Sequence, residues 1–165
     1  MVDYQTISII FAGISIGIAS LYYIINIRHQ QETREASLFN SVYESMLSPE
    51  IFKISWDLLL DWNYTDYNDF MEKYGPDSNR VDYERFHRYF THLEGMGIYV
   101  KRGLIRAELI DDFMSSDVVG FWEKFYPFIL EFRKRRNASA AYEHVEYLYN
   151  KVKPIRDRQH PEHAT

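Results

Sequence analysis

The chain of 165 residues contains no cysteine, and that absence removes several classes of function. Without cysteine there is no disulfide framework, no thiol nucleophile and no zinc site with sulfur ligands. Glycine and proline are scarce, with seven and five residues, and no glycine-rich phosphate loop is present. No stretch of useful length alternates apolar and polar residues as a half-buried strand does. The sequence therefore favours an all-α fold.

Lysine and arginine are missing from the first 27 residues, and residues 4–27 carry no charge of either sign. As a helix with a rise of about 1.5 Å per residue, this run reaches about 36 Å, longer than the roughly 30 Å hydrocarbon core of a bilayer. Tyr4 near one end and Tyr22 and Tyr23 near the other suit the headgroup regions. A secretory signal would have a basic start and a small-residue cleavage site, and both are lacking. We therefore expect one transmembrane helix.

The orientation of this helix follows from the distribution of basic residues. Arg28 and Arg34 come just after the apolar run, with His29 beside them, and cytoplasmic flanks are enriched in lysine and arginine. The prediction is a single-pass membrane protein with its N-terminus outside and its C-terminal domain cytoplasmic. Two glycosylation sequons, which begin at Asn63 and Asn137, would then remain unmodified.

Four segments are expected along the chain. Residues 1–28 form the N-terminal tail and transmembrane helix. Residues 29–47 form a juxtamembrane helical stalk, because residues 28–37 are polar and hold neither glycine nor proline to stop the helix. Residues 48–158 form one compact cytoplasmic helical bundle, and residues 159–165 form a disordered tail.

Apolar residues spaced by three and four predict about five to seven helices in this bundle. Ser48 and Pro49 mark a helix start, and Gly95-Met96-Gly97 an end. Pro127 should kink a long helix or shorten its hydrogen-bond ladder. The predicted helices are 49–62, which is apolar on most sides and so central, a short one at 67–74, 81–94, a long one from about 105, and a last one after 137–139.

The last two helices repeat apolar residues in the same four-three rhythm, which predicts an antiparallel pair. Residues 156–165 are expected to fray at the end of the second helix. Aromatic residues make up 17% of the chain, with 14 tyrosines, 11 phenylalanines and 3 tryptophans. So high a content indicates a domain built around ring packing, or one whose aromatic surface meets a partner.

Small residues on the transmembrane helix give the first candidate site. Gly13 and Gly17 form a G-x-x-x-G pattern with Ser20 close by, and such a face lets two membrane helices approach closely. We expect helix dimerisation there. The same residues match the G-x-S-x-G pattern of serine hydrolases, but that motif needs a strand-to-helix turn, which a membrane helix does not offer.

Four consecutive basic residues give the second candidate site, at the end of the long helix: Arg133, Lys134, Arg135 and Arg136. Cations at a helix C-terminus complement its dipole. In a membrane-tethered domain they can also contact anionic lipid headgroups, which makes a lipid-sensing domain a third hypothesis. Nucleic acid is not an expected partner, because the net charge is −5 and acidic residues lie on the neighbouring faces.

Acidic and histidine-bearing faces within residues 57–92 are the third candidate. Glu84 and His87 form a Glu-x-x-His pair, but a di-iron site needs a second such pair, and the chain has none. His144, between two glutamates, is predicted to be a solvated helix residue. We therefore assign no catalytic, metal or cofactor-binding residue and expect no cofactor.

Several stretches occur together in an order that resembles a known family. They are Asn26-Ile27-Arg28, Thr33-Arg34, the pattern Asp66-Tyr67-x-x-Phe70-x-x-Lys73-Tyr74-Gly75, the run from Glu94 to Ile105, and Trp122-Glu123-Lys124-Phe125. The family is an uncharacterised prokaryotic membrane-anchored family known as domain of unknown function 4760, and the resemblance covers nearly the whole chain. It implies a fold type and a membrane anchor, but no activity and no site residues.

Two functional hypotheses from different classes remain. The first is a binding or regulatory module at the cytoplasmic membrane face, which docks a protein partner or a second copy of itself and uses the bilayer for location. The alternative is a membrane-associated enzyme that acts through the acidic and histidine-bearing helices of residues 57–92. The second hypothesis requires those side chains to converge on a polar pocket.

Overall fold

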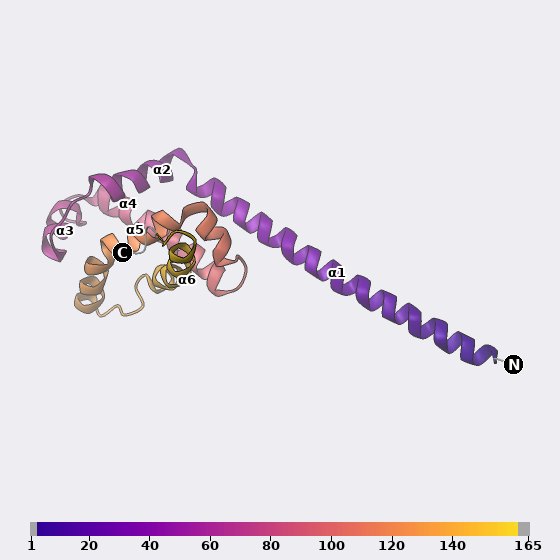
Figure 1. Ribbon diagram of the computed structural model, residues 1–165. Coiled ribbons are helices and arrows are strands. Elements are labelled where there is room, and N and C mark those ends of the chain that lie inside the picture. Colours follow the sequence, from indigo (N-terminus) through magenta and orange to yellow (C-terminus); the bar gives the residue numbers. More distant parts are fainter. Residues whose placement is uncertain (1–2, 162–165) are drawn as a thin grey trace. The chain divides into compact units, whose positions relative to one another are not determined.

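The computed structural model of the chain describes residues 3–161. Contacts divide the chain into two compact units, Met1–Ser37 and Leu38–Thr165. Every regular element in the described range is helical and none is a strand, so the all-α prediction is confirmed (Figure 1).

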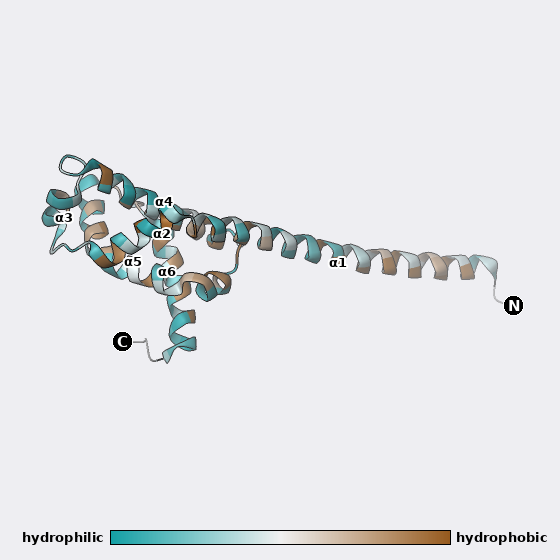
Figure 2. Cartoon of the chain, turned by 90° about the horizontal axis from the view of Figure 1, so that it is seen from above, coloured by the Kyte–Doolittle hydropathy of each residue, from teal (hydrophilic) through white to brown (hydrophobic). Residues whose placement is uncertain are grey.

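Helix α1, Tyr4–Met46, is one uninterrupted helix. It continues through the polar residues 28–37 as predicted, because nothing in their sequence breaks the hydrogen-bond ladder. Hydropathy changes sharply along it, from an apolar N-terminal segment to a polar one (Figure 2). Its last turns belong to the second unit, where Val42 and Met46 are buried.

Helix α2, Pro49–Trp56, starts where it was predicted to start. Ser48 Oγ accepts a hydrogen bond from the backbone N–H of Ile51 at 3.4 Å, which caps the helix. The predicted helix 49–62 does not remain α-helical, however. From Asp57 to Asp61 it widens into the π-helix η1, and the N–H of Trp62 donates to the carbonyl of Asp57 at 3.1 Å.

Helix α3, Tyr67–Tyr74, has the predicted bounds. Helix α4, Arg80–Lys101, was predicted to end at Gly95-Met96-Gly97, but it continues past these residues. A Cβ at Gly97 would lie 2.1 Å from the carbonyl oxygen of His144 on another helix. Gly97 therefore permits the close approach of two helices and does not terminate its own.

Helices α5, Ala107–Arg136, and α6, Glu143–Gln159, form the predicted antiparallel pair. Their ion pairs show the direction, since Arg133 pairs with Glu146 and Glu123 pairs with Lys153. Pro127 lies inside α5, where it lacks the N–H that an α-helical hydrogen bond needs. The backbone of α5 leaves helical geometry at Met114, with φ −153° and ψ 33°.

After α5, the predicted frayed tail begins too early. Asn137, with φ 51°, ends α5 in the left-handed conformation that asparagine tolerates well. Residues 156–159, expected to fray, belong to α6. Of the predicted tail, residues 162–165 lie outside the described range.

Rings fill the centre of the second unit, as the aromatic content predicts. Phe70 of α3 and Phe128 of α5 lie 3.9 Å apart between ring centroids, and Phe86 of α4 contacts both. Six phenylalanines are at most 1% exposed: Phe70, Phe86, Phe90, Phe121, Phe125 and Phe128. This shared core fixes α3, α4 and α5 against one another.

Candidate functional site

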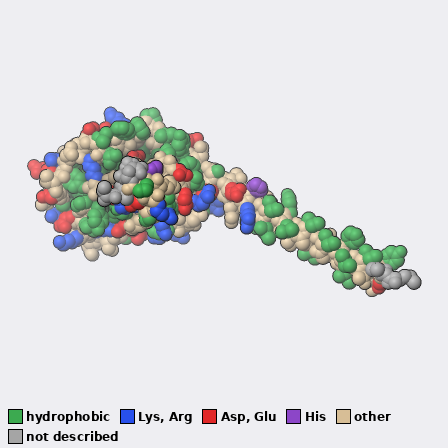
Figure 3. Space-filling view, in the orientation of Figure 1, with side chains coloured by type: hydrophobic (Ala, Val, Ile, Leu, Met, Phe, Trp, Pro, Cys, Tyr) green, Lys and Arg blue, Asp and Glu red, His purple; other side chains and the backbone are tan. Residues whose placement is uncertain are grey.

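The apolar part of α1 is uncovered by the rest of the chain. Its most apolar 18-residue window is 0% buried, and α1 is the one described helix long and apolar enough to cross a membrane. Apolar side chains line it in Figure 3, with the first basic side chains only beyond them. A helix in the core of a soluble protein has its apolar face buried, whereas this window is exposed.

The predicted dimer face is open. A Cβ built at Gly13 or at Gly17 meets nothing within 4 Å. The hydroxyl of Ser20 donates to the carbonyl of Ile16 at 2.8 Å, so it is satisfied within its own helix. This face can accept a second helix by close packing without any serine hydrogen bond between helices.

The basic cluster at the end of α5 is divided between inward and outward side chains. Arg133 is bound within the fold: its Nε donates to the carbonyl of Ala141 at 2.8 Å and its Nη1 lies 2.8 Å from Glu146. Arg135 donates to Glu131 and to Asn68, at 2.9 and 2.8 Å. These two arginines therefore tie α5 to its neighbours.

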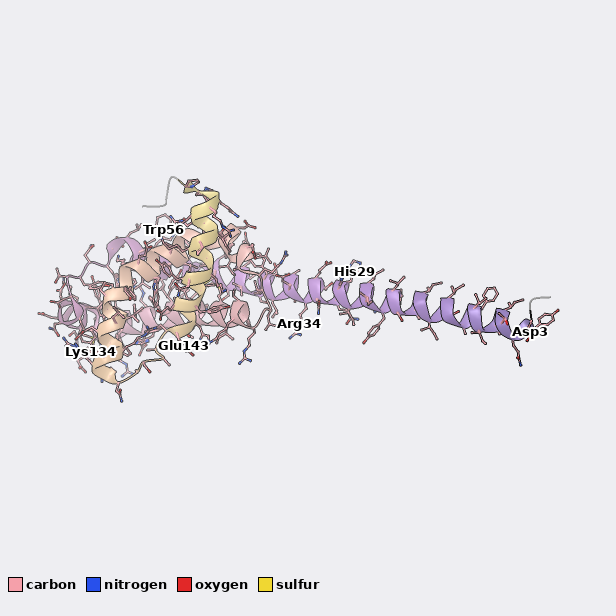
Figure 4. All side chains as sticks on the ribbon, turned by 60° about the horizontal axis from the view of Figure 1, so that its bottom comes forward. Asp3, His29, Arg34, Trp56, Lys134 and Glu143 are labelled. Carbon is pink, nitrogen blue, oxygen red and sulfur yellow. The ribbon has the colours of Figure 1, made fainter. Side chains whose placement is uncertain are left out.

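The other two basic residues point outward. The Lys134 side chain is 79% exposed, at the end of α5 beside the loop that leads to α6 (Figure 4), and Arg136 is also exposed. Lys134 Nζ also lies 4.0 Å from Glu131 Oε2. A lipid headgroup would thus meet two outward basic side chains rather than four, which weakens the expected electrostatic attraction.

The acidic run after η1 is engaged in local structure. Asp66 caps α3 by accepting from the N–H groups of Asn68 and Asp69 at 2.7 and 3.0 Å. Asp69 pairs with Lys73 at 2.9 Å, and this bond is the main cause that lowers the pKa of the Asp69 carboxyl. Asp57 pairs with Arg85 of α4.

Neither histidine of α4 joins these carboxylates. His87 Nδ1 lies 2.7 Å from the phenol oxygen of Tyr142, and burial lowers its pKa. His92 Nδ1 lies 2.9 Å from the backbone carbonyl of Arg88. Within residues 3–161 no three histidine, aspartate or glutamate side chains gather as metal ligands would. The convergence that the enzyme hypothesis requires is not found there.

The prediction for His144 is wrong, because the side chain is not simply solvated. Its Nδ1 lies 3.0 Å from Glu94 Oε2, and Glu94 Oε1 accepts from the backbone N–H groups of His144 and Val145 at 3.1 and 3.2 Å. Glu94 thus caps α6, whose N-cap residue Tyr142 makes no side-chain cap of its own. No local pattern signals a cap 50 residues away.

A second feature missed from the sequence is a partly buried lysine, Lys124. Lys124 of α5 donates to the carbonyls of Leu58 and Leu59 at 2.8 and 2.7 Å. These carbonyls belong to η1, whose widened turn leaves them without ordinary α-helical partners. Burial lowers the pKa of the Lys124 ammonium group.

The third missed feature is an exposed apolar face on α2 and η1. We predicted that helix 49–62 is central, but the structure buries only part of its circumference. Phe52, Trp56 and Leu60 are 48%, 54% and 57% exposed, whereas Ile51 and Ile54 on the opposite side are buried. We call Phe52, Trp56 and Leu60 the α2–η1 face. Its signal in the sequence was an apolar circumference wider than one packing face requires.

A shallow groove of about 250 Å³ lies between residues 41–46 of α1 and residues 92–99 of α4. Val42, Met46 and Met96 form an apolar, nearly fully buried floor. His92 and Tyr99 are its ionisable residues, which is too little charge to hold an ionic ligand.

No curated protein and no solved structure matches the chain. A family model does match, over residues 7–152, which includes most of α1 and ends within α6. The chain therefore belongs to the family described as domain of unknown function DUF4760.

Proposed function

We propose that the chain is a single-pass, membrane-anchored binding or regulatory module, with its N-terminus outside and the helical unit in the cytoplasm. The observation that supports the anchor is the complete exposure of the apolar window of α1. Leaving apolar surface in water costs about 25 cal/mol per Å², so such a helix is stable only against lipid or another apolar helix. Arg28 and Arg34 at its C-terminal flank favour the cytoplasmic side.

The binding role is supported by the α2–η1 face. Phe52 and Trp56 are at least 48% exposed in a unit whose other two tryptophans, Trp62 and Trp122, are each 4% exposed. Exposed aromatic residues that gather on one helix are typical of docking surfaces, where tryptophan is the residue most enriched among binding hot spots.

An enzymatic role receives no comparable support. Asp57 and Asp82 pair with Arg85, and Asp66 caps α3. His87 Nδ1 lies beside the phenol oxygen of Tyr142 instead of beside a carboxylate. A reaction requires a nucleophile, acid or base beside a space for substrate, and these side chains do not share one.

The absence of cysteine allows a direct test of the anchor and its orientation. Two single variants of the full chain, Asp3→Cys and Lys134→Cys, place one thiol on either side of the apolar segment. A membrane-impermeant maleimide should label the first on intact cells and the second only after the membrane is permeabilised. The unchanged chain should not react in either case.

The result that contradicts this proposal is also clear. Labelling of Lys134→Cys on intact cells would reverse the orientation. Recovery of the full chain in the aqueous fraction, with both variants equally reactive after lysis, would remove the anchor itself.

A further inference from the structure

We infer that the occupant of the α2–η1 face is a second copy of this chain, packed against it in antiparallel orientation. This inference rests on the proposed function and names the partner of the same face. The inference rests on the apolar line that Phe52, Trp56 and Leu60 form and on two charged residues beside this line, Lys53 and Asp61.

The apolar line is regular. Phe52, Trp56 and Leu60 follow one another at intervals of four residues, which places them along one side of the helical segment. The rings of Phe52 and Trp56 lie 5.8 Å apart between centroids, so they form one continuous surface. Two such lines can pack face to face as helices do in a bundle.

Some of the charged residues of α2 and η1 form ion pairs within the fold, and others do not. Glu50 pairs with Arg88 and Asp57 pairs with Arg85, both on α4. Lys53 and Asp61 are exposed and form no ion pair within the described part of the chain. These two residues flank the apolar line, with one on each side of Trp56 along the chain.

Asp61 stands in an unfavourable place for its own helix, because a negative charge near the C-terminal end opposes the helix dipole. Lys124 is attracted electrostatically to Asp61, but its ammonium group donates its hydrogen bonds to the carbonyls of Leu58 and Leu59. An external cation beside Asp61 would remove this disadvantage.

A second copy supplies that cation by symmetry. When two identical segments pack antiparallel about a two-fold axis close to Trp56, Lys53 of each copy lies beside Asp61 of the other. The apolar lines then meet along their length, and the interface is isologous, with the same patch used twice. The two Lys53–Asp61 pairs between the copies form together, so the α2–η1 face is complementary in charge to a second copy of itself.

Anchoring makes such a contact effective. Two copies confined to one bilayer meet at a far higher effective concentration than free domains in solution. An interface formed by only Phe52, Trp56, Leu60 and the flanking charges of each copy is therefore enough for association in the membrane.

A charge exchange tests the pairing. Full-length chains carrying donor and acceptor fluorophores are placed in liposomes, and association is measured by energy transfer. Lys53→Asp or Asp61→Lys alone should weaken association by about fivefold or more, because each change brings like charges together in both symmetric contacts. The double variant Lys53→Asp/Asp61→Lys should restore it.

The apolar line is tested beside a matched control. Leu60→Ser should weaken association by about tenfold, whereas Leu130→Ser should leave it unchanged. Leu130 is an exposed leucine of α5, with an exposed fraction of 44% against 57% for Leu60.

These variants should be compared in the native background and with Gly13→Ile and Gly17→Ile added. Association that responds only to the two glycine changes, or a double charge variant that fails to restore it, would overturn the second copy as occupant. The membrane anchor would still stand, since the maleimide labelling measures it independently.

Discussion

His87 is a partly buried histidine whose ring contacts two tyrosines. Its Nδ1 lies 2.7 Å from the phenol oxygen of Tyr142, and Tyr83 packs edge-on against its ring at 4.4 Å. Burial raises the pKa of Tyr142, so the phenol keeps its proton and can donate to the unprotonated imidazole nitrogen. Tyr142 also has φ 58°, a conformation that a bulky residue adopts only when its surroundings hold it there.

The chain should lose stability in mild acid because of this residue. Burial lowers the pKa of folded His87 below its ordinary value of 6.5. Above pH 6.5 the group is neutral in both states and has no effect. As the pH falls below that value, the unfolded chain binds the proton first, so the free energy of unfolding decreases by at most about 1.4 kcal/mol per pH unit.

Chemical unfolding of the full chain in detergent between pH 7 and pH 5 measures this effect. His87→Asn cannot titrate at this position and should flatten the pH dependence between pH 7 and pH 5. An unchanged slope in His87→Asn would show that other groups cause the acid sensitivity.

Residue-level predictions succeeded where the signal was local. Ser48 and Asp66 cap helices a few residues ahead of them, and the sequence marked both helices correctly. Glu94 caps α6 from a different helix, and His144 was misjudged as a result. A contact that depends on tertiary packing leaves no trace in the spacing of neighbouring residues.

At the scale of elements, two glycines of α4 that are two residues apart have opposite roles. Gly97 faces the backbone of α6 at His144, while a Cβ at Gly95 would meet nothing within 4 Å. Gly97→Ala should destabilise the full chain by about 1–3 kcal/mol, because a backbone carbonyl cannot move aside cheaply. Gly95→Ala should be neutral or stabilise it by up to about 1 kcal/mol, since alanine is the better helix former.

Thermal unfolding followed by circular dichroism compares the two variants under one condition. Equal stability of both would show that α4 and α6 lie further apart than described. The same pair explains the boundary error in the sequence prediction. A glycine that ends a helix and a glycine that receives another helix look alike until the neighbour is known.

The segment after Pro49 shows a similar limit. Its start was predictable from Ser48 and Pro49. The donor to the carbonyls of Leu58 and Leu59 in η1 is Lys124, far along the chain on α5, and local sequence does not reveal that contact. Its apolar circumference suggested full burial, because a helix hydrophobic on most sides normally lies in a core. The structure instead leaves one side to solvent, and sequence periodicity cannot tell a core from a docking face.

For the whole molecule, the uncharged run of residues 4–27 predicted one long apolar helix, and the spacing of apolar residues predicted the helices that follow it. The all-α class and the family resemblance are confirmed. The roles of Gly13, Gly17, Ser20 and the outward Lys134 and Arg136 stay predictions, because a single copy without lipid shows no partner for them.

Association through α1 should depend on the open glycine face. Gly13→Ile together with Gly17→Ile should weaken energy transfer between full-length copies in liposomes by roughly tenfold, because bulky side chains keep the two helices apart. Ala19→Ile, on a different side of the helix, is the matched control. An equal loss with Ala19→Ile would show that general crowding of the helix, rather than this face, reduces association.

The burial of the tryptophans gives the native chain an optical reporter. Trp62 and Trp122 are each 4% exposed, while Trp56 is 54% exposed. Iodide in solution should therefore quench chiefly one indole, and the emission of that indole should lie at longer wavelength than the rest. Anything that settles on the α2–η1 face will shift this component to the blue and shield it from iodide, with no label attached.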